Sequence, residues 1–284
     1  MSESAVRRAG AAPPERVEAH ARKAAREELS LTAEATYEVI RREGEMELAR
    51  SSGALAWSGL AAGLAMGFTL VAKGVLHAHL PEAPWRALVT PLGYAAGFLI
   101  VILASQQLFT ENTLKPVVPY LARPTRAAFA NVARLWVVVL LANLVGALLF
   151  AAVAARTGLF PADAREAFAE TARAAVAHGF WISAIKAVFA GWLIALLVWM
   201  LPAAETSHVL VIVAISYLVG VGEFLHIITG SVDVFYLAWS GALGWGDTLT
   251  RFIVPVLIGN SVGGVVMVSL LNHAQVQPEG GEEE

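Results

Sequence analysis

Apolar residues fill six long stretches of the chain, separated by short polar segments. Each stretch holds roughly 20 or more mostly apolar residues, the length that an α-helix needs to cross a hydrocarbon core of ~30 Å. The predicted spans are residues 54–77, 88–107, 131–155, 177–201, 208–238 and 250–271. The sequence therefore predicts an all-α membrane protein with six transmembrane helices.

Composition agrees with a membrane protein and adds how the charge is distributed. Of the 284 residues, 57% are hydrophobic and 15% are charged, with a mean hydropathy of +0.62, which is unusual for a soluble domain. Residues 1–50 hold 9 of the 20 Lys and Arg and 10 of the 23 Asp and Glu. The chain has no cysteine, so it forms no disulfide and carries no thiolate chemistry.

These patterns divide the chain into three parts. Residues 1–53 are predicted to form a charged helical segment, residues 54–273 a six-helix channel domain, and residues 274–284 a disordered acidic tail. The predicted N-terminal helix has only a thin apolar stripe along one side, made by Leu29, Tyr37, Ile40 and Leu48. Such a helix is expected at the membrane surface, against a neighbouring subunit, or in solvent.

The positions of Lys and Arg in short loops predict the orientation. The basic residues flanking the first helix and following the second are Arg41, Arg42, Arg50, Lys115, Arg123, Arg126 and Arg134. Both groups are expected on the cytoplasmic side, which places the N- and C-termini in the cytoplasm.

The second and fifth helices are interrupted. The second begins with Pro91, Gly93 and Gly97 and runs into the polar string SQQLFTENT, and the fifth carries Gly220, Gly222 and Gly230. Irregular backbone at membrane depth is tolerated only where protein buries it or where it lines a water-filled cavity. Interruptions at matching places in two three-helix halves favour an inverted repeat with a site between the halves, as in channels and transporters.

Three ionisable residues, Glu223, His226 and Asp233, lie in the otherwise apolar fifth helix. A charged residue inside a membrane span costs ~2.5–3.5 kcal/mol or more, so a functional role is the default interpretation. Histidine, with an ordinary pKa of ~6.5, can donate and recover a proton near neutrality. His226 is therefore the main candidate for a pore site, with a structural polar cluster as the alternative.

Other candidate residues lie around this helix. Phe98 and Val219 are candidates for an outer constriction. Lys186, in the fourth helix, is expected to face the pore or to pair with Glu223 or Asp233. A seam of small residues around one buried amide is predicted where helices approach closely, at Gly259, Asn260, Gly263 and Gly264.

Three motifs resemble those of one family. QLFTENT (107–113), FLHIITG (224–230) and PVLIGNSVGG (255–264) resemble the loop, fifth-helix and sixth-helix motifs of formate/nitrite transporters. The way in which the chain departs from the family pattern resembles the YfdC-like branch. The resemblance implies an aquaporin-like fold in the inner membrane, assembled as a homopentamer with one pore per protomer. It also implies that Leu108 and Phe109 narrow the cytoplasmic side of the pore and that Thr110 offers a hydroxyl to the permeant.

The chain departs from the family pattern at several positions. The family's acid before the histidine is Leu225, its loop glutamate is Gln107, and two asparagines are replaced by Gly191 and Gly230. The resemblance places Gln107, Gly191 and Gly230 at the permeant's path. Their changed side chains imply weaker or differently selective permeation.

The expected function is channel-like transport of small monovalent anions or their conjugate weak acids, with His226 as proton or hydrogen-bond donor. The alternatives are a channel for neutral solutes and a non-conducting membrane protein whose N-terminal segment docks a cytoplasmic partner. No nucleophile–base pair or phosphate-binding loop occurs in the sequence. An enzyme is not expected, nor is a cofactor, a metal or a nucleic-acid partner.

Overall fold

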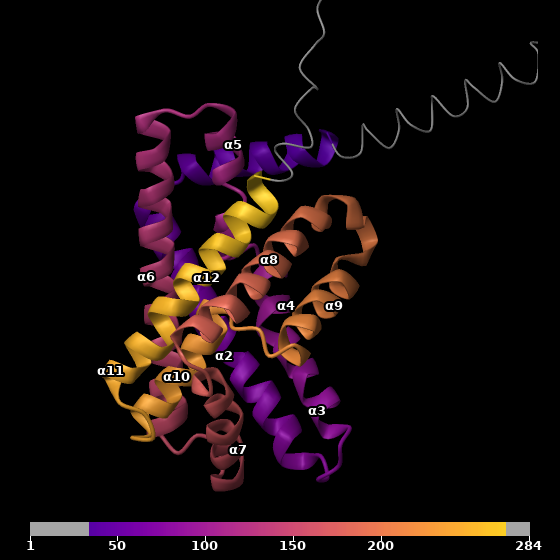
Figure 1. The fold of residues 1–284 in the computed structure, drawn as a ribbon, viewed down its shortest axis with the longest axis vertical. Helices are drawn as coiled ribbons and strands as arrows, with labels where there is room; N and C mark the ends of the chain where they lie inside the picture. The colour runs from indigo at the N-terminus through magenta and orange to yellow at the C-terminus, as the bar shows by residue number, and fades with distance from the viewer. Residues whose placement is uncertain (1–33, 271–284) are drawn as a thin grey trace, which may run out of the picture.

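A computed structural model of the protein describes residues 34–270, and all of its regular structure is helical (Figure 1). Three of the six spans are single helices: the first is α2 (Ser52–His79), the third α6 (Arg126–Arg156) and the fourth α8 (Phe180–Ala204). The second span consists of α3 (Arg86–Val89), η1 (Thr90–Tyr94) and α4 (Ala95–Leu103), and the fifth of α9 (His208–Val221) and α10 (Ile227–Trp239). The sixth consists of η5 (Thr248–Ile253), α12 (Val254–Gly264) and η6 (Val265–Leu270). The predicted all-helical class is confirmed.

The remaining elements are short and lie mostly at the two ends of the bundle (Figure 1). They are a helix over residues 34–49, η2 (Glu111–Thr113), α5 (Val117–Ala122), α7 (Ala162–Arg173), η3 (Ala174–Val176), η4 (Glu205–Ser207) and α11 (Trp245–Asp247). The predictions for residues 1–33, with Leu29, and for the tail 274–284 lie outside the described residues.

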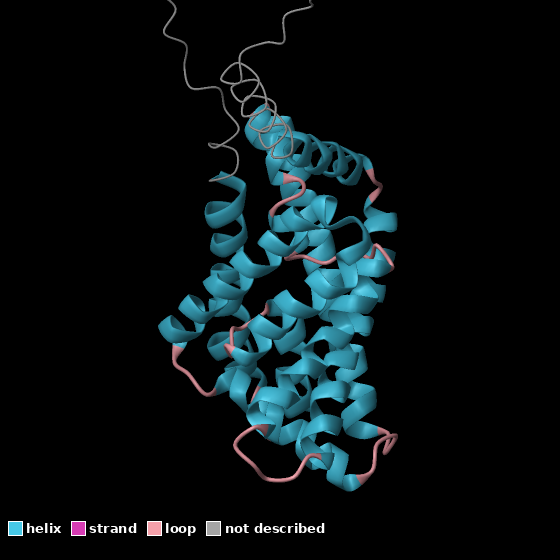
Figure 2. Cartoon of the chain, turned by 90° about the vertical axis from the view of Figure 1, so that its right-hand side faces the viewer, coloured by secondary structure: helices cyan, strands magenta, loops and turns pink. Residues whose placement is uncertain are grey.

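Four helical segments are long and apolar enough to cross a membrane: Ser52–His79, Arg86–Leu103, Arg126–Arg156 and Phe180–Ala204. The fifth span consists of two shorter apolar helices, His208–Val221 and Ile227–Trp239, because residues 222–226 interrupt it. Loop segments accordingly lie within the body of the bundle as well as at its ends (Figure 2).

The interruptions fall at slightly different residues from those predicted. Pro91 and Gly93 lie in the 3₁₀ turn η1, and the second span stops being helical only after Leu103. Gly230 lies inside the unbroken helix α10, where its N–H donates to the carbonyl of His226 at 2.9 Å. The break therefore ends at His226, the N-cap, and α10 runs unbroken from Ile227 through Gly230 and Asp233.

The two interruptions have the same backbone geometry. Ser105 and Glu223 are the two non-glycine residues with positive φ in the described chain, and both have φ 51°. The residue after each donates its N–H back into the preceding helix, Gln106 to the carbonyl of Val101 at 2.9 Å and Phe224 to that of Val219 at 3.0 Å. A left-handed residue costs a non-glycine side chain some strain, so its occurrence at both places marks a shared local fold.

Helix packing repeats in the two halves as well. A Cβ on Gly63 of α2 would lie 2.1 Å from the carbonyl oxygen of Asn143, and a Cβ on Gly191 of α8 would lie 2.3 Å from that of Asn260. Because α2 starts at the end of the bundle near helix 34–49 and α8 starts at the opposite end (Figure 1), the two halves are inverted copies. This is the predicted three-plus-three inverted repeat.

Helix 34–49 packs on the end of the bundle instead of standing free. Ile40 is fully buried in a cluster with Leu114, Val118 and Val198. On the same helix, bonds from Arg41 and Arg42 lower the pKa of Glu38 to about 2. Through this contact, helix 34–49 packs against its own chain at one end of the bundle.

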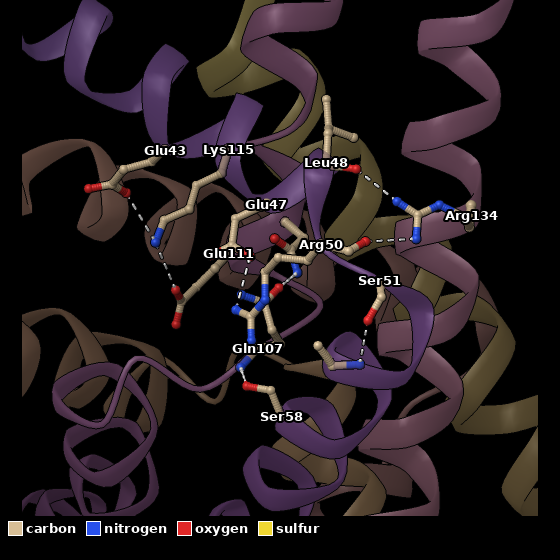
Figure 3. A network of polar contacts seen from close by, with 12 residues as sticks. Glu43, Glu47, Leu48, Arg50, Ser51, Ser58, Gln107, Glu111, Lys115 and Arg134 are labelled. Carbon is tan, nitrogen blue, oxygen red and sulfur yellow. Dashed lines mark hydrogen bonds and ion pairs between the residues drawn. The ribbon is translucent and has the colours of Figure 1, made fainter.

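Polar contacts reinforce the docking of helix 34–49 (Figure 3). The Arg134 guanidinium of α6 donates to the carbonyls of Leu48 and Arg50 at 2.8 and 3.1 Å. Lys115 Nζ lies 3.3 Å from a carboxylate oxygen of Glu43 on the helix and 3.5 Å from one of Glu111. Glu111 belongs to the loop that follows the second span, which we call the inner loop. Helix 34–49 is therefore tied to the loop that follows the second span.

Candidate pore site

The break in the fifth span sets the position of His226. Its backbone is extended (φ −102°, ψ 129°), and its imidazole is the N-cap of α10, with Nδ1 accepting the N–H of Thr229 at 3.2 Å. A backbone N–H is always the donor. The neutral imidazole must therefore carry its proton on Nε2.

The break in the second span supplies the partner of that proton. Thr110 Oγ1 lies 2.7 Å from His226 Nε2, and both side chains are buried. Thr113 Oγ1 donates to the carbonyl of Thr110 at 2.7 Å and helps to fix its backbone. Since Thr110 accepts the Nε2–H, its own hydroxyl hydrogen remains available to another acceptor.

Apolar side chains enclose this polar pair. The Phe98 ring meets the His226 ring edge-on, with centroids 5.1 Å apart. Val219 is fully buried and, like His226, lines a cavity. Leu108 and Phe109 are also buried, and Phe109 packs edge-on against Trp136 of α6 at 5.6 Å.

A cavity of about 640 Å³ opens toward the end of the bundle that carries α3 and α7, and we call it the vestibule. His226, Lys73, Tyr94 and Asp233 are among its lining residues. Sequence reasoning missed Lys73, although the rule applied to His226 would have found it, because Lys73 is also an ionisable residue inside a predicted span.

The structure settles the partners of the other charged residues. Asp233 pairs with Lys73, with Oδ2 and Nζ 2.8 Å apart, so it is not the partner of Lys186. Lys186 pairs with Glu223 at 3.3 Å, but the Glu223 side chain is 69% exposed. Of the two partners expected for Lys186, Glu223 is therefore the one in contact, and it is exposed because it occupies the left-handed turn of the break.

Two asparagines hold the two breaks in place. Asn260 Oδ1 accepts the N–H of Ile227 at 2.7 Å, and its Nδ2 donates to the carbonyls of Leu225 and Ala187 at 2.9 and 2.7 Å. Its amide thus joins both sides of the break to α8, and Asn260 belongs to the framework of the pore.

Asn143 of α6 makes the equivalent set in the other half. Its Oδ1 accepts the N–H of Phe109 at 2.9 Å, and its Nδ2 donates to the carbonyls of Gln107 and Gly59 at 2.8 and 2.7 Å. Sequence reasoning missed Asn143, whose only signal was a lone amide in an apolar span.

Three positions expected along the permeant's path, Gln107, Gly191 and Gly230, contact residues of the surrounding loop and helices. The Gln107 side chain accepts from Asn112 Nδ2 at 3.0 Å within the inner loop. Gly191 packs against the backbone of Asn260, and a Cβ on Gly230 would lie 2.2 Å from the Phe252 ring. Helix α12 and the Phe252 ring fill the space that an asparagine side chain at either glycine would need.

The sixth-helix glycines form the predicted packing seam. A Cβ on Gly259 would lie 2.2 Å from the carbonyl of Ala184, and one on Gly263 would lie 2.2 Å from that of Val188. Gly264 lies against Thr113 in the same way. Within residues 34–270, no group of three His, Asp or Glu side chains could hold a metal ion.

An inverted repeat of membrane helices, with two broken spans meeting at a buried histidine, defines a channel-type membrane transport protein and not an enzyme. Residues 34–274 match the formate/nitrite transporter family, and the chain belongs to that family.

Curated relatives and solved structures agree with this membership. The chain is 41% identical over 243 residues to the inner membrane protein YfdC of Escherichia coli, covering 86% of this chain and 78% of that protein. It is 28% identical over 210 residues to the formate channel BtFdhC of Bacillus thuringiensis, covering 71% and 78%.

Two solved structures share the fold at 21% identity. An FNT family ion channel matches with a TM-score of 0.73, covering 87% of this chain and 99% of that one. A pentameric formate channel with formate bound matches with a TM-score of 0.66, covering 78% and 95%.

Proposed function

We propose that the protein conducts small monovalent anions of the formate and nitrite class, together with a proton, through a pore centred on His226. The observation that carries this proposal is the contact between His226 and Thr110. It joins the two broken spans at 2.7 Å, and His226 is one of the residues that line the vestibule.

The apolar surroundings explain why a proton is needed. Moving a carboxylate-sized ion from water into a dry environment carries an idealised Born cost of order 20 kcal/mol. The neutral acid avoids most of that cost. Phe98 and Val219 on the vestibule side, and Leu108 and Phe109 on the other, are the proposed constrictions between which the permeant sheds water.

The hydrogen-bond directions suit a donor site. The free hydroxyl hydrogen of Thr110 can donate to an oxygen of the permeant, while His226 Nε2–H donates to Thr110 Oγ1. For proton transfer, His226 takes up one proton from solution as one passes through Thr110 to the permeant, so the imidazole ends neutral. The substrate class also follows the formate channels among this chain's relatives and structural neighbours.

Substitutions of His226 test this role. In proteoliposomes, His226→Phe should lower formate flux by roughly 100-fold or more, the scale of a lost general acid. His226→Asn keeps a hydrogen bond but cannot titrate, so its residual flux should no longer depend on pH between 5 and 8. Parent-like transport by both folded variants across that range would exclude the histidine from the permeation mechanism.

Assembly and orientation are part of the same proposal. We expect a homopentamer in the inner membrane with one pore per protomer and with helix 34–49 on the cytoplasmic side, where Arg41, Arg42 and Lys115 lie. Native mass spectrometry in detergent should give five copies. A stable monomer or trimer would contradict the proposed assembly.

A neutral-solute channel is the second candidate, and one observation favours it. The deep vestibule contains the balanced pair Lys73–Asp233, so these two residues add no net positive charge to attract anions. Glycerol flux in the same proteoliposomes separates the two functions, because an anion–proton pathway should carry formate and nitrite and exclude glycerol.

A further inference from the structure

The Lys73–Asp233 pair lies beside the pore but takes no part in the contact between His226 and Thr110. Both side chains line the vestibule, with side-chain exposures of 12% and 7%. A buried ion pair is weak evidence for stability, because desolvation offsets its attraction. Because the pair lines the cavity, a molecule in the vestibule can contact both side chains.

Each partner retains unused hydrogen-bonding capacity. Lys73 Nζ carries three N–H donors, and its one bond to the described chain is with Asp233 Oδ2 at 2.8 Å. Asp233 Oδ1 is buried and accepts no hydrogen bond from any described residue. Beside them, the Tyr94 ring lies under the ammonium at 5.6 Å.

This arrangement is complementary to a carboxylic acid, not to a bare anion. The two free N–H groups of Lys73 suit the carbonyl oxygen of an acid, and the free oxygen of Asp233 suits an O–H. A second carboxylate facing Asp233 would be repelled, since two close carboxylates cannot both ionise. One proton must therefore accompany each anion.

We propose that Lys73 and Asp233 form an outer permeant subsite, at which a small carboxylate or nitrite anion binds Lys73 and shares one proton from solution with Asp233. The anion, one proton and the ion pair combine into a complex with one more bound proton than the empty site. When the neutral acid leaves toward His226, it keeps the proton, and Asp233 returns as a carboxylate to Lys73.

Polar groups continue from this subsite to the histidine. Tyr94 lines the vestibule together with Lys73, Asp233 and His226. Thr229 Oγ1 lies 3.3 Å from His226 Nδ1. The acid can therefore pass through the vestibule to the site between His226 and Thr110, which keeps it protonated, and at this step the inference rests on the proposed function.

Other ionisable groups surround the pair, and Lys73 is the only described residue bonded to Asp233. On the elements packed around α10 they are His77, Tyr94, Arg156, Arg165, Glu170 and Arg251. At the rim of the vestibule they are Glu82, Arg86 and Glu223. Contacts among these outer groups, such as His77 with Glu170 at 3.0 Å, do not include Asp233.

Proton uptake on binding tests the subsite separately from transport. Sodium formate or sodium nitrite is added to the weakly buffered, detergent-solubilised protein, and a pH indicator reports the protons taken up. We expect about one proton per bound anion, in the parent and in His226→Phe. The charge-balanced variant Lys73→Met/Asp233→Asn should lose this uptake, while the matched rim variant Lys186→Met/Glu223→Gln should keep it.

The outcomes distinguish this inference from the proposed function. Uptake that persists in a His226→Phe protein without flux supports an independent subsite, as does uptake by a parent protein that fails to transport formate. No binding of either anion by the parent, binding without proton uptake, or unchanged uptake in Lys73→Met/Asp233→Asn overturns it. The parent measurement decides the matter even if that double variant does not fold.

Discussion

The two broken spans share one framework but differ in what they carry. Each break has a residue at φ 51°, and each is held by one asparagine through three hydrogen bonds. We call the break at residues 104–110 of the second span the inner break and that at residues 222–226 of the fifth span the outer break. Asn143 binds the carbonyl of Gln107, which precedes Leu108, and Asn260 binds that of Leu225, which precedes His226. A repeated backbone thus presents an apolar side chain in one half and a titratable one in the other.

The surroundings of the two breaks differ as well. Helix 34–49 and Lys115 cover the inner break, where Glu111 is buried (Figure 3). The outer break faces the vestibule, and its Glu223 is exposed. The inverted repeat therefore supplies a symmetric scaffold, whereas single side chains and the N-terminal helix make its two ends different.

Removing either asparagine should break the symmetric framework and give the largest effect. Asn143→Ala or Asn260→Ala removes the acceptor of one buried N–H and the donor to two carbonyls, one of them in the break. Each unmet group costs ~1–3 kcal/mol, so the free energy of unfolding should fall by roughly 3 kcal/mol or more. Thermal unfolding in detergent measures this loss.

The matched control is Asn131→Ala, an exposed asparagine on the same helix as Asn143, which should change stability little. If Asn143→Ala and Asn260→Ala each unfold at the same temperature as the parent, the two asparagines do not stabilise the breaks.

A side chain at Gly191 or Gly230 should give the next largest effect. Gly191→Asn places Cβ against the Asn260 backbone, and Gly230→Asn drives it into Phe252. Overpacking costs typically ~1–3 kcal/mol, so both variants should lose stability and gain no formate flux. Gly53→Ala is the control, since its Cβ would meet nothing within 4 Å. A stable double variant with raised flux would restore both positions to the permeant's path.

The ion pairs beside the two breaks should give unequal effects. Lys115→Met leaves the buried Glu111 carboxylate uncompensated, which costs roughly 3 kcal/mol. Lys186→Met removes a contact with the exposed Glu223, and exposed pairs contribute only ~0–1 kcal/mol. Thermal unfolding of the two variants side by side compares them. Equal losses would contradict the difference in burial between the two breaks.

The sequence by itself determined the class of the protein and the region of its site. Hydropathy is a local property summed along a span, so the six helices and their approximate bounds could be predicted. An ionisable residue is costly in any apolar span, wherever its neighbours lie, and this singled out His226 without a structure. The two interrupted spans likewise followed from local punctuation by glycine, proline and polar residues.

Only the tertiary structure decided which groups meet. Lys73 and Asp233 are 160 residues apart in the chain, and spacing alone could not prefer this pair over Lys186 with Asp233. Asn143 became recognisable once three backbone groups converged on its amide. The sequence predicted that Gly191 lies on the permeant's path, but in the structure it packs against Asn260. Which residues fill the space beside a glycine depends on the helices around it. Contacts between distant segments depend on how helices pack, and that packing is a property of the whole bundle.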